Sequence, residues 1–360
     1  MDTYRLRLRI LIFLIIAGLY SIDNAVAQQT GKWRVKNRIQ ASFEFDDNIR
    51  EIPSDTASKI EDSSLKFLFH SRAFRRSPKT YLTFAYRGGF QTYFENSFEN
   101  KLINEFETAT SFKVNKFAIG LRGSGRLKIY LNDILDYVTG SAEFYVRLPQ
   151  ILNFGNEVTF KTTGLNYQNF SSFDYSEHQI RWTISRRIAS RFTLKFELSG
   201  KRVNYDRSAI DFVSVENRLQ LLDTRQQDNN FEALFRLSYA KSFVLNLSYS
   251  FQRNNSNSFG YGYYKHQVVL VFGFPLPYGA WLRGYGATQI KDYFEETLPM
   301  FPTDIDTERE ESNFIILDFS KDLNTNLTAL LRLACYNNES IIRSRFYQKT
   351  LVTLGFDFRF

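Results

Sequence analysis

Hydrophobic and polar side chains alternate with a period of two along almost the whole chain after residue 32. Between residues 192 and 200, one side of the pattern reads Phe, Leu, Phe, Leu, and the other reads Thr, Lys, Glu, Ser. The segment 243–252 repeats this pattern. Successive side chains of a strand point to opposite faces, so the pattern predicts strands with one apolar and one polar face. The runs approach the length that a tilted strand needs to cross a bilayer.

Sixteen segments of this kind follow one another. They cover residues 32–47, 63–74, 79–94, 102–114, 116–130, 137–148, 155–169, 176–187, 190–205, 229–240, 242–254, 263–274, 279–294, 312–321, 325–338 and 345–360. An even number is what a single-chain bacterial barrel with both ends on one side of the membrane requires.

The connections between these segments alternate in length. After even-numbered segments they are tight, as at 115–116, 188–189 and 240–241. After odd-numbered segments they are longer and polar, as at 48–62, 206–228, 255–262 and 295–311. Short periplasmic turns and long extracellular loops are typical of outer-membrane barrels. The sequence therefore predicts an all-β fold, a single closed antiparallel transmembrane β-barrel of about 16 strands.

Closure has a physical reason. Inside the hydrocarbon layer every backbone N–H and C=O needs a partner, and a sheet meets that demand only when its first and last strands pair. We therefore expect 32–47 to pair with 345–360. Sixteen strands leave a lumen too wide for side chains to fill, so we expect it to hold water.

Both chain ends indicate export. Three arginines (Arg5, Arg7 and Arg9) precede an apolar run over 10–20, and Ala25–Val26–Ala27 supplies a small-x-small cleavage pattern. The apolar run is too short for a permanent transmembrane helix, so we expect a signal peptide over 1–27 and a barrel over 28–360. An uncleaved anchor is the less favoured alternative.

The last strand carries alternate apolar residues that end in a terminal aromatic: Val352, Leu354, Phe356, Phe358 and Phe360. This resembles the C-terminal signature that the barrel-assembly machinery reads. Together with the signal peptide, it predicts the outer membrane of a Gram-negative bacterium as the location, with outer-membrane lipids and that machinery as partners.

The polar faces of the strands supply the candidate lining of the lumen. Charges are tolerable there only where water or counter-charges solvate them. The candidates are Arg122, Arg126, Lys128, Glu143, Arg147, Lys161, Arg181, Lys195, Glu197, Lys201, Glu232, Arg236, Lys349 and Arg359. The excess of Arg and Lys indicates a mild anion preference. An even mix of paired charges that stiffens the wall is the alternative, and both stay open.

Composition agrees with a barrel and disfavours other classes. The chain has 36 Phe and 21 Tyr, which suit a lipid-facing band and its interfacial girdles. The net charge of +8 is spread along the chain without a basic helical motif, which argues against nucleic acid as a partner. Cys335 is the only cysteine, so no intramolecular disulfide forms.

Candidate chemistry is sparse. The three histidines (His70, His178 and His266) show no nucleophile–base arrangement, so we expect no enzyme. The loop 295–311 is acidic, but it lacks the ordered ligand spacing of a calcium site, and Asp46–Asp47–Asn48 is better explained as a chain turn. Without a phosphate-binding glycine loop or zinc spacing, we expect no cofactor or metal.

Phe45–Asp46–Asp47–Asn48–Ile49 stands where the first strand meets the first long loop. It resembles the start of porin-like outer-membrane barrels, similar in style to barrels associated with exosortase systems and to surface-lipoprotein assembly modifiers. The resemblance implies fold and compartment, and it transfers no activity because fold alone does not dictate function.

Two functional hypotheses follow. The first is a porin-like channel for small polar solutes. The second is a non-conducting envelope component that serves surface-polysaccharide or protein export or assembly, adhesion, or attachment of a partner. The loop 206–228 holds apolar residues that would fold into the lumen or bind a partner. A homo-oligomer or an export partner stays open, because no outward polar strip marks an interface.

Overall fold

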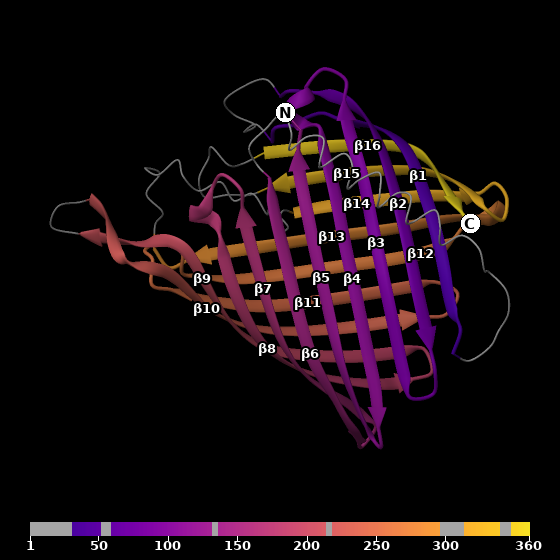
Figure 1. Ribbon diagram of the computed structural model, residues 1–360, viewed down its shortest axis with the longest axis horizontal. Helices are drawn as coiled ribbons and strands as arrows, with labels where there is room; N and C mark the ends of the chain where they lie inside the picture. The colour runs from indigo at the N-terminus through magenta and orange to yellow at the C-terminus, as the bar shows by residue number, and fades with distance from the viewer. Residues whose placement is uncertain (1–30, 52–58, 132–135, 214–217, 296–312, 339–346) are drawn as a thin grey trace.

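The protein is a closed barrel of sixteen strands, each paired antiparallel with its neighbours in chain order (Figure 1). This computed structural model describes residues 31–51, 59–131, 136–213, 218–295, 313–338 and 347–360. The prediction of an all-β closed antiparallel barrel with sixteen strands is confirmed. No helix among these residues is both long and apolar enough to span a membrane.

The strands are long, and most contain 13 to 15 residues. Their bounds are β1 Trp33–Asp46, β2 Asp62–Arg76, β3 Thr80–Tyr93, β4 Lys101–Val114, β5 Phe117–Tyr130, β6 Tyr137–Ile151, β7 Phe154–Tyr167, β8 Tyr175–Ala189, β9 Phe192–Val213, β10 Arg218–Ala240, β11 Val244–Ser256, β12 Tyr263–Pro275, β13 Ala280–Tyr293, β14 Asn313–Asp322, β15 Leu327–Asn338 and β16 Tyr347–Arg359. Three short 3-10 turns complete the described elements: η1 Ser97–Glu99, η2 Ser171–Phe173 and η3 Pro277–Gly279.

The barrel closes where β1 pairs with β16. The register runs from Arg38 opposite Arg359 to Asp46 opposite Leu351. Asn37 and Phe360 exchange two further backbone hydrogen bonds of 3.1 Å, so pairing continues to the last residue of the chain. The expected pairing of the first and last strands is therefore present, and it leaves the sheet without an open edge.

The two faces of the barrel differ in side-chain chemistry. Large apolar side chains on the convex outer face are widely exposed, for example Leu121, Ile180 and Leu354. Polar side chains converge on the concave inner face and are therefore buried among one another, as Ser64 and Asp228 are. The usual arrangement of a soluble domain is thus inverted, as a lipid-facing exterior demands.

Connections segregate by length. The tight turns, such as the one between β4 and β5, lie at one end of the barrel (Figure 1). The longer connections lie at the other end (Figure 1). At this long-connection end, Tyr137, Leu165 and Tyr167 form a small buried apolar cluster, against which Phe170 and Phe173 pack.

The expectation of a 23-residue loop over 206–228 is wrong. Strand β9 continues to Val213 and β10 begins at Arg218, so the two form a hairpin that projects beyond the other strands (Figure 1). Register shifts near Arg225 break the alternation of β10, which is why its sequence looks irregular. In its described part the hairpin extends away from the barrel and does not fold into the lumen. Strand β11 likewise extends to Ser256, into a stretch expected to be loop.

Two sequence predictions fall outside the described residues. They are the signal peptide over 1–27 and all of the acidic loop 295–311 except Glu295. Glu295 accepts a hydrogen bond of 2.8 Å from the backbone N–H of Gly260.

Candidate functional site in the barrel lumen

The charged residues selected from the sequence all lie on the face of their strands that carries the buried polar side chains. Cross-strand neighbours place them side by side. Arg122 lies opposite Glu143, which in turn lies opposite Lys161. The others follow the same parity: Arg126, Lys128, Arg147, Arg181, Lys195, Glu197, Lys201, Glu232, Arg236, Lys349 and Arg359. The inner wall therefore presents charge along most of its circumference.

Many of these cations form ion pairs with carboxylates on the same or adjoining strands. The clearest pairs join Arg126 to Glu105 at 2.8 Å, Arg147 to Glu157 at 2.6 Å, Lys195 to Glu197 at 2.5 Å and Lys201 to Glu177 at 3.3 Å, and Arg122 also pairs with Glu143. A paired cation has its charge largely neutralised at close range. The net field in the lumen is therefore weaker than a count of Arg and Lys indicates.

A smaller set lacks such partners. Within the part of the chain that the structure describes, Lys161, Arg236 and Glu232 form no ion pair or hydrogen bond. Arg181 donates only to the amide oxygen of Gln179, at 2.9 Å. Among the selected residues, the charges without a carboxylate or cationic partner are thus few, and three of these four are positive.

Aromatic rings hold several cations against the wall. The Arg122 guanidinium lies 4.1 Å from the ring centroid of Tyr145, and Arg147 lies 5.1 Å from the same ring. The Lys128 ammonium lies 4.7 Å from the Tyr130 ring and 5.7 Å from the Tyr137 ring. Cation–π attraction at these distances restrains long side chains that would otherwise adopt many conformations in the lumen.

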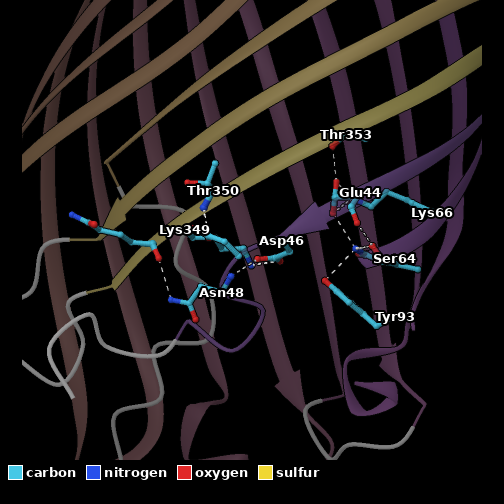
Figure 2. Close-up of polar contacts among 12 residues, drawn as sticks. Glu44, Asp46, Asn48, Ser64, Lys66, Tyr93, Lys349, Thr350 and Thr353 are labelled. Atoms are coloured by element: carbon cyan, nitrogen blue, oxygen red, sulfur yellow. Dashed lines mark hydrogen bonds and ion pairs between the residues drawn. The ribbon is translucent and has the colours of Figure 1, made fainter. Parts of the chain in front are cut away.

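A polar cluster spans the closure between the first and last strands (Figure 2). We call it the seam cluster: Glu44, Asp46, Lys66, Gln91, Lys349 and Thr353. At its centre the Glu44 carboxylate accepts hydrogen bonds from Lys66 at 2.8 Å, Gln91 at 3.0 Å and Thr353 at 2.9 Å. These donors come from β2, β3 and β16, so one carboxylate links four strands. Burial of the charge is tolerable because each oxygen has charged or polar donors.

The Asp-Asp-Asn motif extends this link beyond the ends of the strands (Figure 2). Asp46 pairs with Lys349 at 2.8 Å and accepts the backbone N–H of Asn48 at 3.0 Å. The Asp47 carboxylate accepts the backbone N–H of Thr350 at 2.6 Å, and the Asn48 side chain donates to the backbone oxygen of Gln348 at 3.1 Å. The motif turns the chain and ties that turn to the last strand.

Sequence reasoning selected Glu143, Glu197 and Glu232 but missed most of the other acidic residues of the wall and part of its basic residues. The omitted residues include Glu44, Asp46, Lys66, Arg87, Glu105, Glu157, Glu177, Asp318, Arg332 and Asp357. All of them share the strand parity of the selected residues, so the alternation itself was the signal that would have found them.

The histidines do not form a catalytic group. His70 faces the lumen between Arg38 and Arg87, whereas His178 and His266 lie on the outer face of other strands. Among the described residues, no group of three or more His, Cys, Asp and Glu side chains is placed to hold a metal ion. The residues of the proposed assembly signal lie on the outer face of the barrel, whereas Thr353 between them on the same strand faces the lumen. They are Val352, Leu354, Phe356, Phe358 and Phe360.

The fold is similar to that of a solved porin. The anion-selective porin from Comamonas acidovorans shares 9% identity and a TM-score of 0.51 over 92% of this chain and 100% of that chain. OprD of Pseudomonas aeruginosa matches at 9% identity (TM-score 0.45; 92% and 96% covered), and OmpT of Vibrio cholerae at 6% (0.47; 94% and 100%). No protein-family model and no curated protein matches the sequence.

Identities this low show the fold alone, which is a closed barrel of the porin type. The resemblance to exosortase-associated and assembly-modifier barrels stays a prediction.

Proposed function

We propose that the protein is a porin-like diffusion channel for small polar solutes in the outer membrane of a Gram-negative bacterium. The observation that carries the proposal is the pairing of an apolar outer face with a charged inner face in a closed barrel of sixteen strands. Barrels of this size enclose more space than their inner side chains fill, so water and solutes pass along the wall. The signal peptide predicted over 1–27 and the C-terminal apolar signature support export and barrel assembly.

A mild anion preference is the finer part of the proposal. The paired cations contribute little to it, because a carboxylate lies against each of them. Lys161, Arg181 and Arg236 would supply it, since they face the lumen without a carboxylate partner among the described residues. Charge exposed in a narrow, low-dielectric passage raises the local concentration of counter-ions.

Planar-bilayer recordings of the purified, detergent-refolded barrel test the channel. Addition of protein should raise the membrane current in steps, with conductance that increases with salt concentration. Vesicle swelling with uncharged sugars of increasing size gives an independent measure of lumen width. A folded barrel, identified by its faster electrophoretic migration before heating, that leaves the bilayer sealed would rule the proposal out.

The projecting β9–β10 hairpin favours one second candidate, a non-conducting component that binds a partner. Leu221 is 61% exposed near the hairpin tip and lies opposite Ile210. An exposed leucine that packs beside a half-buried isoleucine beyond the barrel wall has no role in diffusion. The double substitution Ile210→Ser and Leu221→Ser should leave conductance unchanged if the protein is a channel. Leu152→Ser is the matched control, since Leu152 is 82% exposed at the tight-turn end.

A partner-binding component predicts a different result. It would show no conductance in either form, and cross-linking in intact cells would lose an adduct only in the hairpin variant.

A further inference from the structure

The inner wall of the barrel is not uniformly polar. Two cross-strand rows on β12–β15 are apolar on the lumenal face. One row joins Val271, Tyr285, Ile316 and Ala334, each opposite the next. The neighbouring row joins Val269, Ala287 and Phe314. We call these residues the apolar wall.

Strand parity places the apolar wall inside the barrel. Val269 lies opposite the buried Ser248 of β11, and Ile316 precedes the lumenal Asp318 by two residues on β14. The outward neighbour Ile315 is 61% exposed on the convex face. The apolar wall therefore borders the same space as the charged wall formed by β4–β9.

Aromatic side chains give this wall an open surface. The Tyr285 and Phe314 rings lie 4.9 Å apart between centroids, with their planes at 55°. Tyr285 is 42% exposed although it lies in the middle of a strand on the concave face. Contact between apolar surface and lumenal water is unfavourable, so a solute that covers this surface is favoured. A hydrated inorganic ion has no apolar surface with which to do so.

One cation stands beside this surface without a counter-ion. Arg283 precedes Tyr285 by two residues on β13 and lies opposite Asp318. Both oxygens of Asp318 already accept hydrogen bonds from Arg332, at 2.6 and 3.0 Å. Within the described residues, Arg283 forms no ion pair or hydrogen bond, and its side chain is exposed. The stem of Arg283 passes over Gly273, where a Cβ would lie 3.8 Å from its Cγ.

We infer that Arg283 and the apolar wall form a binding site for small amphipathic anions, solutes with a ring and a carboxylate such as benzoate. The inference rests on the proposed channel for access to the lumen. Residues two apart on a strand are separated by about 7 Å, which matches the span between the carboxylate and the far edge of such a ring. The guanidinium holds the carboxylate through two parallel hydrogen bonds while the ring lies on Tyr285 and Ile316.

Binding is measured separately from conduction. Isothermal titration of the folded barrel in non-ionic detergent uses three probes: benzoate, acetate and benzylamine. Benzoate should bind, acetate should bind at least tenfold more weakly because it leaves the wall uncovered, and benzylamine should not bind. Arg283→Gln should weaken benzoate binding by about tenfold or more, since a hydrogen-bonded charge contributes about 1.5 kcal/mol or more.

Matched variants isolate the two parts of the site. Ile316→Ser should weaken benzoate and leave acetate unchanged, because it removes apolar contact alone. Lys113→Gln removes a lumenal cation of β4 that forms no ion pair among the described residues and lies on the part of the wall remote from β12–β15, so it should leave benzoate binding unchanged. Equal loss in Lys113→Gln and Arg283→Gln, or equal affinity for benzoate and acetate, would overturn the inference. Benzoate binding without conductance would contradict the proposed channel and support the binding site. Conductance without benzoate binding would support the channel and contradict the binding site.

Discussion

Glu44 shows how much of the barrel depends on single side chains. Its carboxylate accepts hydrogen bonds from Lys66, Gln91 and Thr353 and is nearly buried. Glu44→Gln keeps the shape but presents an amide N–H₂ to donors and removes the counter-charge of Lys66. We expect the free energy of unfolding, measured in urea, to be about 1–3 kcal/mol lower in Glu44→Gln than in the wild type. This is the cost of leaving buried polar groups without partners.

The matched control for Glu44 is Glu232→Gln. Glu232 faces the lumen on β10 but forms no ion pair or hydrogen bond among the described residues. The free energy of unfolding of Glu232→Gln should lie within about 0.5 kcal/mol of the wild-type value, as is usual for substitutions of side chains that make few contacts. Equal destabilisation of the two variants would show that the seam cluster has no special role in closure.

The closure between β1 and β16 is the element on which the barrel depends, and the two strands approach each other closely at Gly355. A Cβ at this position would lie 2.6 Å from the Cβ of Ser42 and 2.7 Å from the backbone oxygen of Ala41. Gly355→Ala therefore forces the two strands apart, at a cost of about 1–3 kcal/mol. We expect the variant to show less of the fast-migrating folded form before heating, and a lower unfolding midpoint.

Gly200→Ala is the control for this element, because a Cβ there meets no atom within 4 Å. It should fold as the wild type does, or gain a few tenths of a kcal/mol from the restricted unfolded chain. If both glycine variants folded equally well, strand pairing at the closure would be looser than the register shows.

The strands themselves were predictable because their signal is local. Alternation on β5 or β16 can be read from the segment alone, and closure follows from the need to pair every backbone group. The β9–β10 hairpin was missed because register shifts near Arg225 interrupt the alternation. The ion pairs were missed because partner choice depends on register between strands. That Glu105 pairs with Arg126, and Asp318 with Arg332 rather than Arg283, appears only when neighbouring strands are aligned.

At the scale of the whole molecule, an arginine introduced on the outer face should destabilise the barrel more than an arginine introduced on the inner face. Leu121 lies on the outer face and Ser124 on the inner face of β5. Leu121→Arg should destabilise the barrel in lipid vesicles by about 2–4 kcal/mol, the cost of a cation near the bilayer midplane. Ser124→Arg should cost less than about 1 kcal/mol because lumenal water solvates the added charge. Similar losses in guanidinium unfolding would contradict the assignment of the outer face to lipid.

The ion pairs also decide how the lumen as a whole selects ions. Exchange of a paired couple, Arg122→Glu with Glu143→Arg, conserves the charge of the wall and should leave the reversal potential in a salt gradient unchanged. Reversal of the unpaired cations, Lys161→Glu with Arg236→Glu, should shift it from anion towards cation preference. The shift should be large at 0.1 M salt, where charges act over about 10 Å, and nearly vanish at 1 M, where they act over about 3 Å. If the paired exchange shifted the potential as much as the unpaired reversal, selectivity would follow the position of individual charges and not the uncompensated charge of the wall.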